Sequence, residues 1–153
     1  MKRVKRLFFW LCWPGLYVYF RSGHRSRVLI TAEGKTLLVK GLWGRLFGDE
    51  AWGLPGGGIR RGESAASGAV RELFEELQLR IDPSQLVPLG SARVAERGIA
   101  YKADFFVLSL TAMPDIAYLS QELQAAEWFS DPEIQKTQVK PEVAQALLFR
   151  AHR

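Results

Sequence analysis

The sequence predicts an α/β fold in which helices pack on a mixed β-sheet, and three observations lead to this class. Two β-branched, apolar runs flank a turn at Glu33-Gly34, a glycine-rich stretch covers residues 42–64, and a helical pattern begins where that stretch ends. Two further strand-like runs and a closing helical segment complete the chain. Strands interleaved with helices indicate a sheet sandwiched between helices.

Each expected element rests on a local pattern. Ser64 is suited to be the N-cap of the first helix, and the apolar residues that follow it recur at helical spacing on one face. Pro141 suits the first turn of the last helix. The expected elements are a hairpin over 27–41, a helix over 64–77, strands over 86–95 and 100–112, and a helix over 141–153.

Composition limits the functional classes. The 153 residues are 48% hydrophobic and 24% charged, as is typical of a single globular domain. The net charge of +5 comes from residues 1–27, which hold seven Lys/Arg and no acid, whereas the rest holds fourteen against sixteen acids. The basic pI is therefore weak support for nucleic-acid binding. The single Cys12 excludes an internal disulfide and is compatible with a reducing, cytoplasmic location.

Residues 1–26 are expected to be a separate basic and aromatic segment, before a folded domain over 27–153. Its apolar run, residues 7–20, is too short for a spanning helix, which needs roughly 20 residues, and no good signal-peptide cleavage site follows it. Three interpretations stay open: packing against the domain or a second subunit in a homodimer, peripheral contact with an anionic membrane, and a cleaved or spanning segment.

Three glutamates crowd one side of the helix expected over 64–77. Glu72, Glu75 and Glu76 fall within about a quarter turn of one another at roughly 100° per residue. Like charges at this spacing repel by a few tenths of a kcal/mol per pair. On spacing alone, such a row is usually a solvated helix face, so a role for the glutamates needs a wider motif.

The stretch "GGIRRGESAASGAVRELFEELQL" supplies that motif, because it resembles the Nudix box. The box reads Gly, five residues, Glu, seven residues, Arg-Glu-apolar, one residue, Glu-Glu, one residue, Gly, apolar. The matching positions here are Gly57, Glu63, Arg71, Glu72, Leu73, Glu75, Glu76 and Leu79. The closing glycine is replaced by Gln78, which is expected to strain or rebuild the end of the helix without removing a metal ligand.

The resemblance implies a Nudix-type α/β/α sandwich with a mixed β-sheet, and a helix that presents its acids to Mg²⁺ or Mn²⁺. It implies that Glu72, Glu75 and Glu76 bind the cation directly or through water, with the Gly56 carbonyl as a further ligand. Glu63 and Arg71 are expected to orient these carboxylates through charge-assisted hydrogen bonds.

A base or an additional ligand is often supplied in this family from a loop beyond the box. Glu122 lies six residues before Trp128, the spacing seen in MutT-like members, and is the preferred candidate; Glu127 and Glu96 compete with it. Glu72 and Glu122 are the candidate catalytic bases.

Substrate contacts are less defined. Arg60 and Arg61 beside the glycine-rich loop are candidates to meet phosphate, against simple solvent exposure. Trp52, like Trp43, is a candidate to stack on a base, although large aromatic residues near a loop are more often part of the core.

The implied activity is metal-dependent hydrolysis of a diphosphate linkage in a nucleoside diphosphate derivative, a pyrophosphohydrolase reaction on an acid anhydride. The alternatives are a non-catalytic Nudix-like module that binds or senses a nucleotide, and a pyrophosphohydrolase acting on RNA 5′ ends. The intact glutamate cluster favours catalysis, and the slightly acidic body gives the RNA alternative no positive support.

Overall fold

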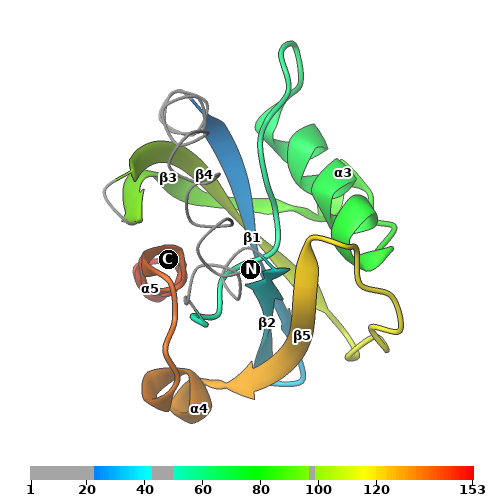
Figure 1. The fold of residues 1–153 in the computed structure, drawn as a ribbon, viewed down its shortest axis with the longest axis vertical. Coiled ribbons are helices and arrows are strands. Elements are labelled where there is room, and N and C mark those ends of the chain that lie inside the picture. The colour runs from blue at the N-terminus through cyan, green and yellow to red at the C-terminus, as the bar shows by residue number, and fades with distance from the viewer. Residues whose placement is uncertain (1–22, 43–49, 97–98) are drawn as a thin grey trace, which may run out of the picture.

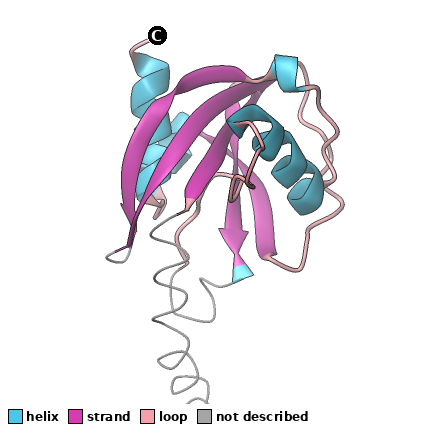
Figure 2. Ribbon diagram, turned by 90° about the horizontal axis from the view of Figure 1, so that it is seen from above, coloured by secondary structure: helices cyan, strands magenta, loops and turns pink. Residues whose placement is uncertain are grey.

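The structure is a computed structural model that describes residues 23–42, 50–96 and 99–153. Its strands are β1 (His24–Ala32), β2 (Lys35–Gly41), β3 (Val87–Glu96), β4 (Ile99–Leu110) and β5 (Leu123–Ser130). Its helices are α3 (Ala65–Leu77), α4 (Asp131–Lys136) and α5 (Pro141–Ala151), with a 3-10 turn at Pro83–Gln85. The strands form one sheet of order β3-β4-β1-β2-β5, with α3 on one face and α5 on the other (Figures 1 and 2). The predicted sandwich with a mixed sheet is confirmed.

Strand β1 lies at the centre of the sheet. It pairs in parallel with β4 over its whole length and antiparallel with β2. The hairpin turn falls where the sequence predicts it, because Glu33 and Gly34 take positive φ angles of 49° and 74°, which suit a tight two-residue connection. Strand β3 pairs antiparallel with β4, and strand β5 pairs antiparallel with β2.

The glycine-rich loop fills a gap between β1 and β2. The two strands pair directly only near their turn, from Ile30 to Ala32 on β1. Further from the turn, the loop forms the hydrogen bonds that a neighbouring strand would otherwise make. These are Ser26 N–H to Gly57 O (2.9 Å), Val28 N–H to Pro55 O (3.0 Å), Val39 N–H to Gly53 O (3.0 Å) and Gly53 N–H to Val39 O (2.8 Å). The loop is thus fixed against the central strand.

The core is divided between the two faces of the sheet. Because side chains alternate along a strand, Val28 and Ile30 pack with the apolar face of α3, whereas Leu29 packs with Val143 and Ala146 of α5. All five of these side chains are buried. The apolar face of α3 therefore anchors the helix and leaves its glutamates at the edge of the packed interface.

Both ends of α3 are fixed by local hydrogen bonds. Ser64 is the N-cap, as predicted, and its hydroxyl accepts from Ser67 N at 3.1 Å. At the other end, Gln78 adopts the left-handed conformation, with φ 56°, that a box glycine would adopt easily. Its backbone N–H and side-chain Nε2 both donate to Phe74 O, at 3.0 and 3.1 Å. The glutamine therefore keeps the helix ending and adds a hydrogen bond to it.

Of the expected N-terminal segment, residues 1–26, the first 22 residues lie outside the described part of the chain. Trp43 also lies outside it. Within the three described ranges, no helix has both the length and the apolar character needed to cross a bilayer.

Candidate active site

Arg71 is the centre of a charged network on α3. Its Nε and Nη2 donate to Glu63 at 3.0 and 3.1 Å, and its Nη1 donates to Glu72 at 2.8 Å and Glu75 at 3.1 Å. Nη2 also donates to Gly58 O at 2.8 Å, which ties the helix to the glycine-rich loop. The hydrogen bonds from Arg71 hold the pKa of Glu63 below its ordinary value, and those to Glu63 and Glu72 raise the pKa of Arg71. One guanidinium thus contacts three motif carboxylates.

Glu76 occupies a different environment, turned toward the loop. Its Oε2 accepts from Gly56 N–H at 2.9 Å. Burial of the carboxyl raises its pKa to about 7; the Gly56 hydrogen bond and the charge of Arg27 oppose this shift, and the charges of Glu72 and Glu122 add to it. Three carboxylates, Glu72, Glu76 and Glu122, therefore concentrate negative potential beside the loop.

Glu122 lies in the loop before β5, and its charge acts on Glu76. That loop is joined to the C-terminal end of α3 by a hydrogen bond from Ser120 N to Glu76 O of 3.0 Å. Its competitors lie elsewhere: Glu96 pairs with Lys140 at 2.8 Å at the end of β3, and Glu127 is exposed within β5. Of the three candidates, Glu122 is the one whose charge acts on Glu76.

Two glycines allow the loop to approach the carboxylates and the central strand. A Cβ on Gly57 would lie 2.6 Å from the Glu72 carboxyl carbon. Gly56 has φ 122°, and a Cβ there would lie 2.4 Å from Ser26 O. A side chain at either position would displace its neighbour, so the close approach of loop, β1 and α3 depends on glycine at both.

The candidate substrate-binding residues differ in their surroundings. Arg60 is exposed and pairs with Glu75 at 3.1 Å, so it lies next to the charged network. Arg61 is exposed in the turn that precedes α3. Trp52 is only 8% exposed; its ring packs edge-on against Phe129 at 4.9 Å between centroids, and Lys40 Nζ lies 4.8 Å from it. Trp52 thus occupies the core position that the sequence offered as its alternative.

Sequence reasoning missed three residues behind the loop. Arg27, Tyr101 and Glu142 form a buried polar cluster, and an Arg27 nitrogen donates to the Gly56 carbonyl. No local motif marks them, because Arg27 and Glu142 are 115 positions apart in the chain. The one available signal was a charged residue, Arg27, at the start of an apolar strand.

The carboxylates fit a hard divalent cation by their chemistry. Their oxygens are the ligands that Mg²⁺ and Mn²⁺ prefer. Burial raises the pKa of Glu76, and the charges of Glu72 and Glu122 add to that shift. Over the described ranges, no group of three acidic, His or Cys side chains is arranged as a ready ligand set. Glu72 and Glu75 face Arg71 instead, and would have to turn to share one ion.

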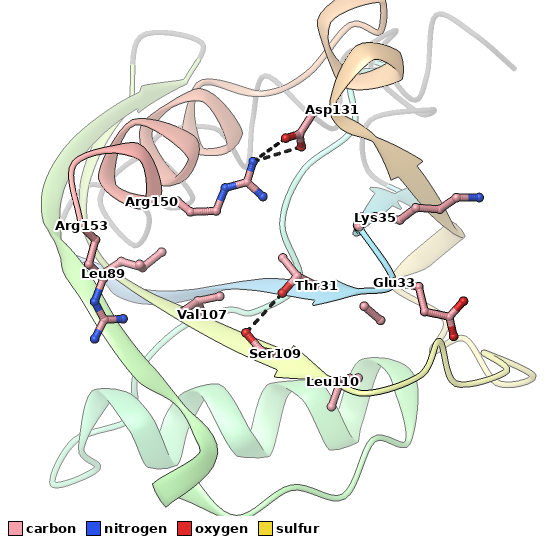
Figure 3. A pocket seen from close by; sticks show the side chains of 12 residues that line it. Thr31, Glu33, Lys35, Leu89, Val107, Ser109, Leu110, Asp131, Arg150 and Arg153 are labelled. Carbon is pink, nitrogen blue, oxygen red and sulfur yellow. Dashed lines mark hydrogen bonds and ion pairs between the residues drawn. The ribbon is translucent and has the colours of Figure 1, made fainter.

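One hollow among the described residues lies away from these carboxylates. It has a volume of about 460 Å³ and opens at the β1–β2 turn, at the opposite end of β1 from Ser26 (Figure 3). Arg150 and Asp131 pair across it at 2.9 and 3.0 Å, and Thr31 donates to Ser109 at 3.4 Å within it. None of the predicted site residues lines it. The candidate site is therefore defined by the carboxylates and the glycine-rich loop, not by the size of a cavity.

Comparison with known proteins agrees with this arrangement. The model of the NUDIX domain family matches residues 23–148, so the chain belongs to the Nudix family, as the motif predicts. An RNA pyrophosphohydrolase of Shewanella piezotolerans is 44% identical over 72 residues, which cover 47% of this chain and 39% of that protein. The chain thus aligns with less than half the length of this curated relative.

Two solved structures show the same fold at low identity. The MutT protein from Methanosarcina mazei has a TM-score of 0.68 at 23% identity, covering 85% of this chain and 91% of its own. A bifunctional NMN adenylyltransferase/ADP ribose pyrophosphatase from Francisella tularensis has a TM-score of 0.72 at 15% identity, covering 98% of this chain and 47% of its own. These likenesses support the fold and leave the substrate open.

Proposed function

We propose that the protein is a pyrophosphohydrolase that uses Mg²⁺ or Mn²⁺ to cleave a diphosphate linkage in a nucleoside diphosphate derivative. The observation that carries the proposal is the close approach of two motif carboxylates to the glycine-rich loop: Gly56 N–H donates to Glu76 Oε2 at 2.9 Å, and the Glu72 carboxyl group packs against Gly57. Such a concentration of carboxylates suits a site that holds cations and, through them, a polyanionic substrate.

Glu72, Glu75, Glu76 and the Gly56 carbonyl would hold the metal. When bound, the metal would neutralise phosphate oxygens and lower the pKa of a coordinated water. Glu72 or Glu122 takes the proton from the attacking water, and hydrogen bonds from Arg71 keep the Glu72 and Glu75 side chains beside each other. Arg60, which pairs with Glu75 on the exposed side, is within the same network and is the better placed of the two loop arginines to meet a substrate phosphate.

A second candidate substrate is the 5′ end of RNA. The curated relative with 44% identity carries the name RNA pyrophosphohydrolase, and this favours the alternative more than the sequence did alone. Both substrates present a phosphoric anhydride to the same carboxylates, so the proposed chemistry is shared. The difference between them lies in what surrounds the anhydride.

The test is a substrate screen with the wild-type protein and Glu76→Gln. Nucleoside triphosphates, ADP-sugars, dinucleotides and 5′-triphosphorylated RNA are incubated with Mg²⁺ or Mn²⁺, and released phosphate, pyrophosphate and monophosphate are measured. Release that requires metal and is abolished by Glu76→Gln supports hydrolysis, and the ranking of rates selects the substrate. Tight nucleotide binding without release would instead support the non-catalytic module.

A further inference from the structure

A buried charge pair joins the C-terminal helix to the central strand, behind the glycine-rich loop. Arg27 of β1 and Glu142 of α5 are 7% and 2% exposed, and Arg27 Nε donates to Glu142 Oε2 at 2.9 Å. Tyr101 of β4 donates its hydroxyl to the same oxygen at 2.5 Å. Leu54 N–H donates to Glu142 Oε1 at 3.1 Å. Both carboxylate oxygens of Glu142 are therefore hydrogen bonded away from water.

Stability alone does not account for this pair. Removing two charges from water is costly, and replacing a buried ion pair with packed apolar residues is often neutral or stabilising. The position is also sterically exacting, because a Cβ on Gly53 would lie 2.8 Å from Glu142 Oε1. The pair needs a glycine beside it, and a tyrosine hydroxyl and a backbone amide to complete its hydrogen bonds. This arrangement suggests that the pair serves to position neighbouring groups.

The buried pair also contacts the backbone of Gly56 in the glycine-rich loop. An Nη1 nitrogen of Arg27 donates to the Gly56 carbonyl, while the Gly56 N–H donates to Glu76 Oε2 at 2.9 Å. Gly56 lacks a Cβ and has φ 122°, so its own backbone preference does not fix the orientation of the two peptide groups that flank it. Arg27 on one side and Glu76 on the other supply that restraint.

We propose that Arg27, Tyr101 and Glu142 are positioning residues of the metal site: Glu142 and Tyr101 hold the Arg27 guanidinium, which orients the Gly56 carbonyl and, through the Gly56 backbone, the N–H that binds Glu76. This inference rests on the proposed metal-dependent function. A carbonyl oxygen has two lone pairs, so the Gly56 oxygen can accept from Arg27 and still face a cation. Glu142 also neutralises a guanidinium that would otherwise repel that cation.

The test measures Mn²⁺ binding to the full chain without substrate, by the electron paramagnetic resonance signal of free Mn²⁺. The variants are Arg27→Lys, Glu142→Gln and Tyr101→Phe. Lysine keeps the charge beside Glu142 but lacks the fork that bonds Glu142 and Gly56 together. Val143→Ala is the matched control, because Val143 is fully buried in the same helix and has no polar side-chain contact to lose. Thermal unfolding of every variant is recorded in parallel.

We expect Arg27→Lys and Glu142→Gln to weaken Mn²⁺ binding about tenfold, as loss of a residue behind a metal ligand commonly does, and Tyr101→Phe to weaken it less. Val143→Ala should lower the melting temperature and leave Mn²⁺ affinity at the wild-type value. In turnover assays, the Mn²⁺ concentration for half-maximal rate should rise in the three variants, with most of kcat recovered at saturating Mn²⁺.

Two results would overturn the inference: wild-type Mn²⁺ affinity in folded Arg27→Lys and Tyr101→Phe, or losses of affinity that follow melting temperature equally in Val143→Ala. Tyr101→Phe removes one hydroxyl and keeps the ion pair, so it decides the question if Glu142→Gln fails to fold. Absence of Mn²⁺ binding and of hydrolysis in the wild-type protein would overturn the proposed function itself, and is thereby distinguished from failure of the positioning role alone.

Discussion

Replacing Gly57 by alanine should lower the catalytic rate strongly and the stability of the fold only slightly. The new Cβ would lie 2.6 Å from the Glu72 carboxyl carbon and 2.7 Å from both of its oxygens. To reach ordinary van der Waals contact, the carboxylate must withdraw by about 0.8 Å, and a misplacement of about 1 Å in a catalytic site can lower the rate about 100-fold. Because the displaced group is the end of a flexible side chain, the free energy of unfolding should fall by only about 1 kcal/mol, the usual scale of a strained rotamer.

The neighbouring glycine provides the control. A Cβ on Gly58 would meet no atom within 4 Å, so Gly58→Ala changes the same loop without touching Glu72. Initial rates at saturating Mg²⁺, with the best substrate from the screen, are compared for the two variants, and urea unfolding checks that both are folded. Equal rates for Gly57→Ala and Gly58→Ala would refute the reasoning that Glu72 acts from the position packed against the loop.

Three other predictions concern the helix end, the loop glutamate and the buried pair. Gln78→Gly relieves a φ of 56° that costs about 1 kcal/mol and loses an exposed hydrogen bond worth about 0.5 kcal/mol or more, so urea unfolding should show equal or slightly higher stability, with unchanged turnover; a large gain in turnover would contradict this. Glu122→Gln should greatly slow turnover and leave the melting temperature unchanged, whereas Glu127→Gln, at an exposed position of β5, should change neither turnover nor melting temperature; the opposite pattern would remove Glu122 from the site. Burial alone would raise the pKa of Glu142, but Arg27 and the other donors lower it below the ordinary 4.5; the ionised carboxylate therefore stabilises the fold above that pH and loses this contribution as the pH falls through its lower native pKa. Between pH 5 and 3, the melting temperature should thus fall more steeply in the wild type than in Glu142→Gln, and parallel curves would contradict the assignment.

Local sequence patterns predicted much of the fold. The hairpin turn at Glu33-Gly34 and the N-cap at Ser64 lie where the sequence places them, because turn geometry and capping are decided by a few adjacent residues. Helix α4 and the full extent of β5 had no sufficient local signal. Strand β5 owes its place to pairing with β2, from which it is separated by most of the chain.

The departure at Gln78 shows the limit of reasoning from a single position. The sequence predicted a strained or rebuilt end of α3 at Gln78, and the structure shows a left-handed residue there. It did not indicate that the glutamine amide would donate to the Phe74 carbonyl and so stabilise the ending that its Cβ disfavours. The outcome depended on a side-chain rotamer, which the motif does not specify.

By itself, the sequence determined the Nudix membership and the row of Glu72, Glu75 and Glu76 on one helix, since both depend on spacing within a short segment. Only the tertiary structure decided which distant residues lie behind the glycine-rich loop. It joined Arg27 to Glu142 across 115 positions so that their buried charges meet behind Gly56. The physical reason is that charge interactions act through space, so their partners are set by the packing of strands and helices and leave no pattern in the neighbouring sequence.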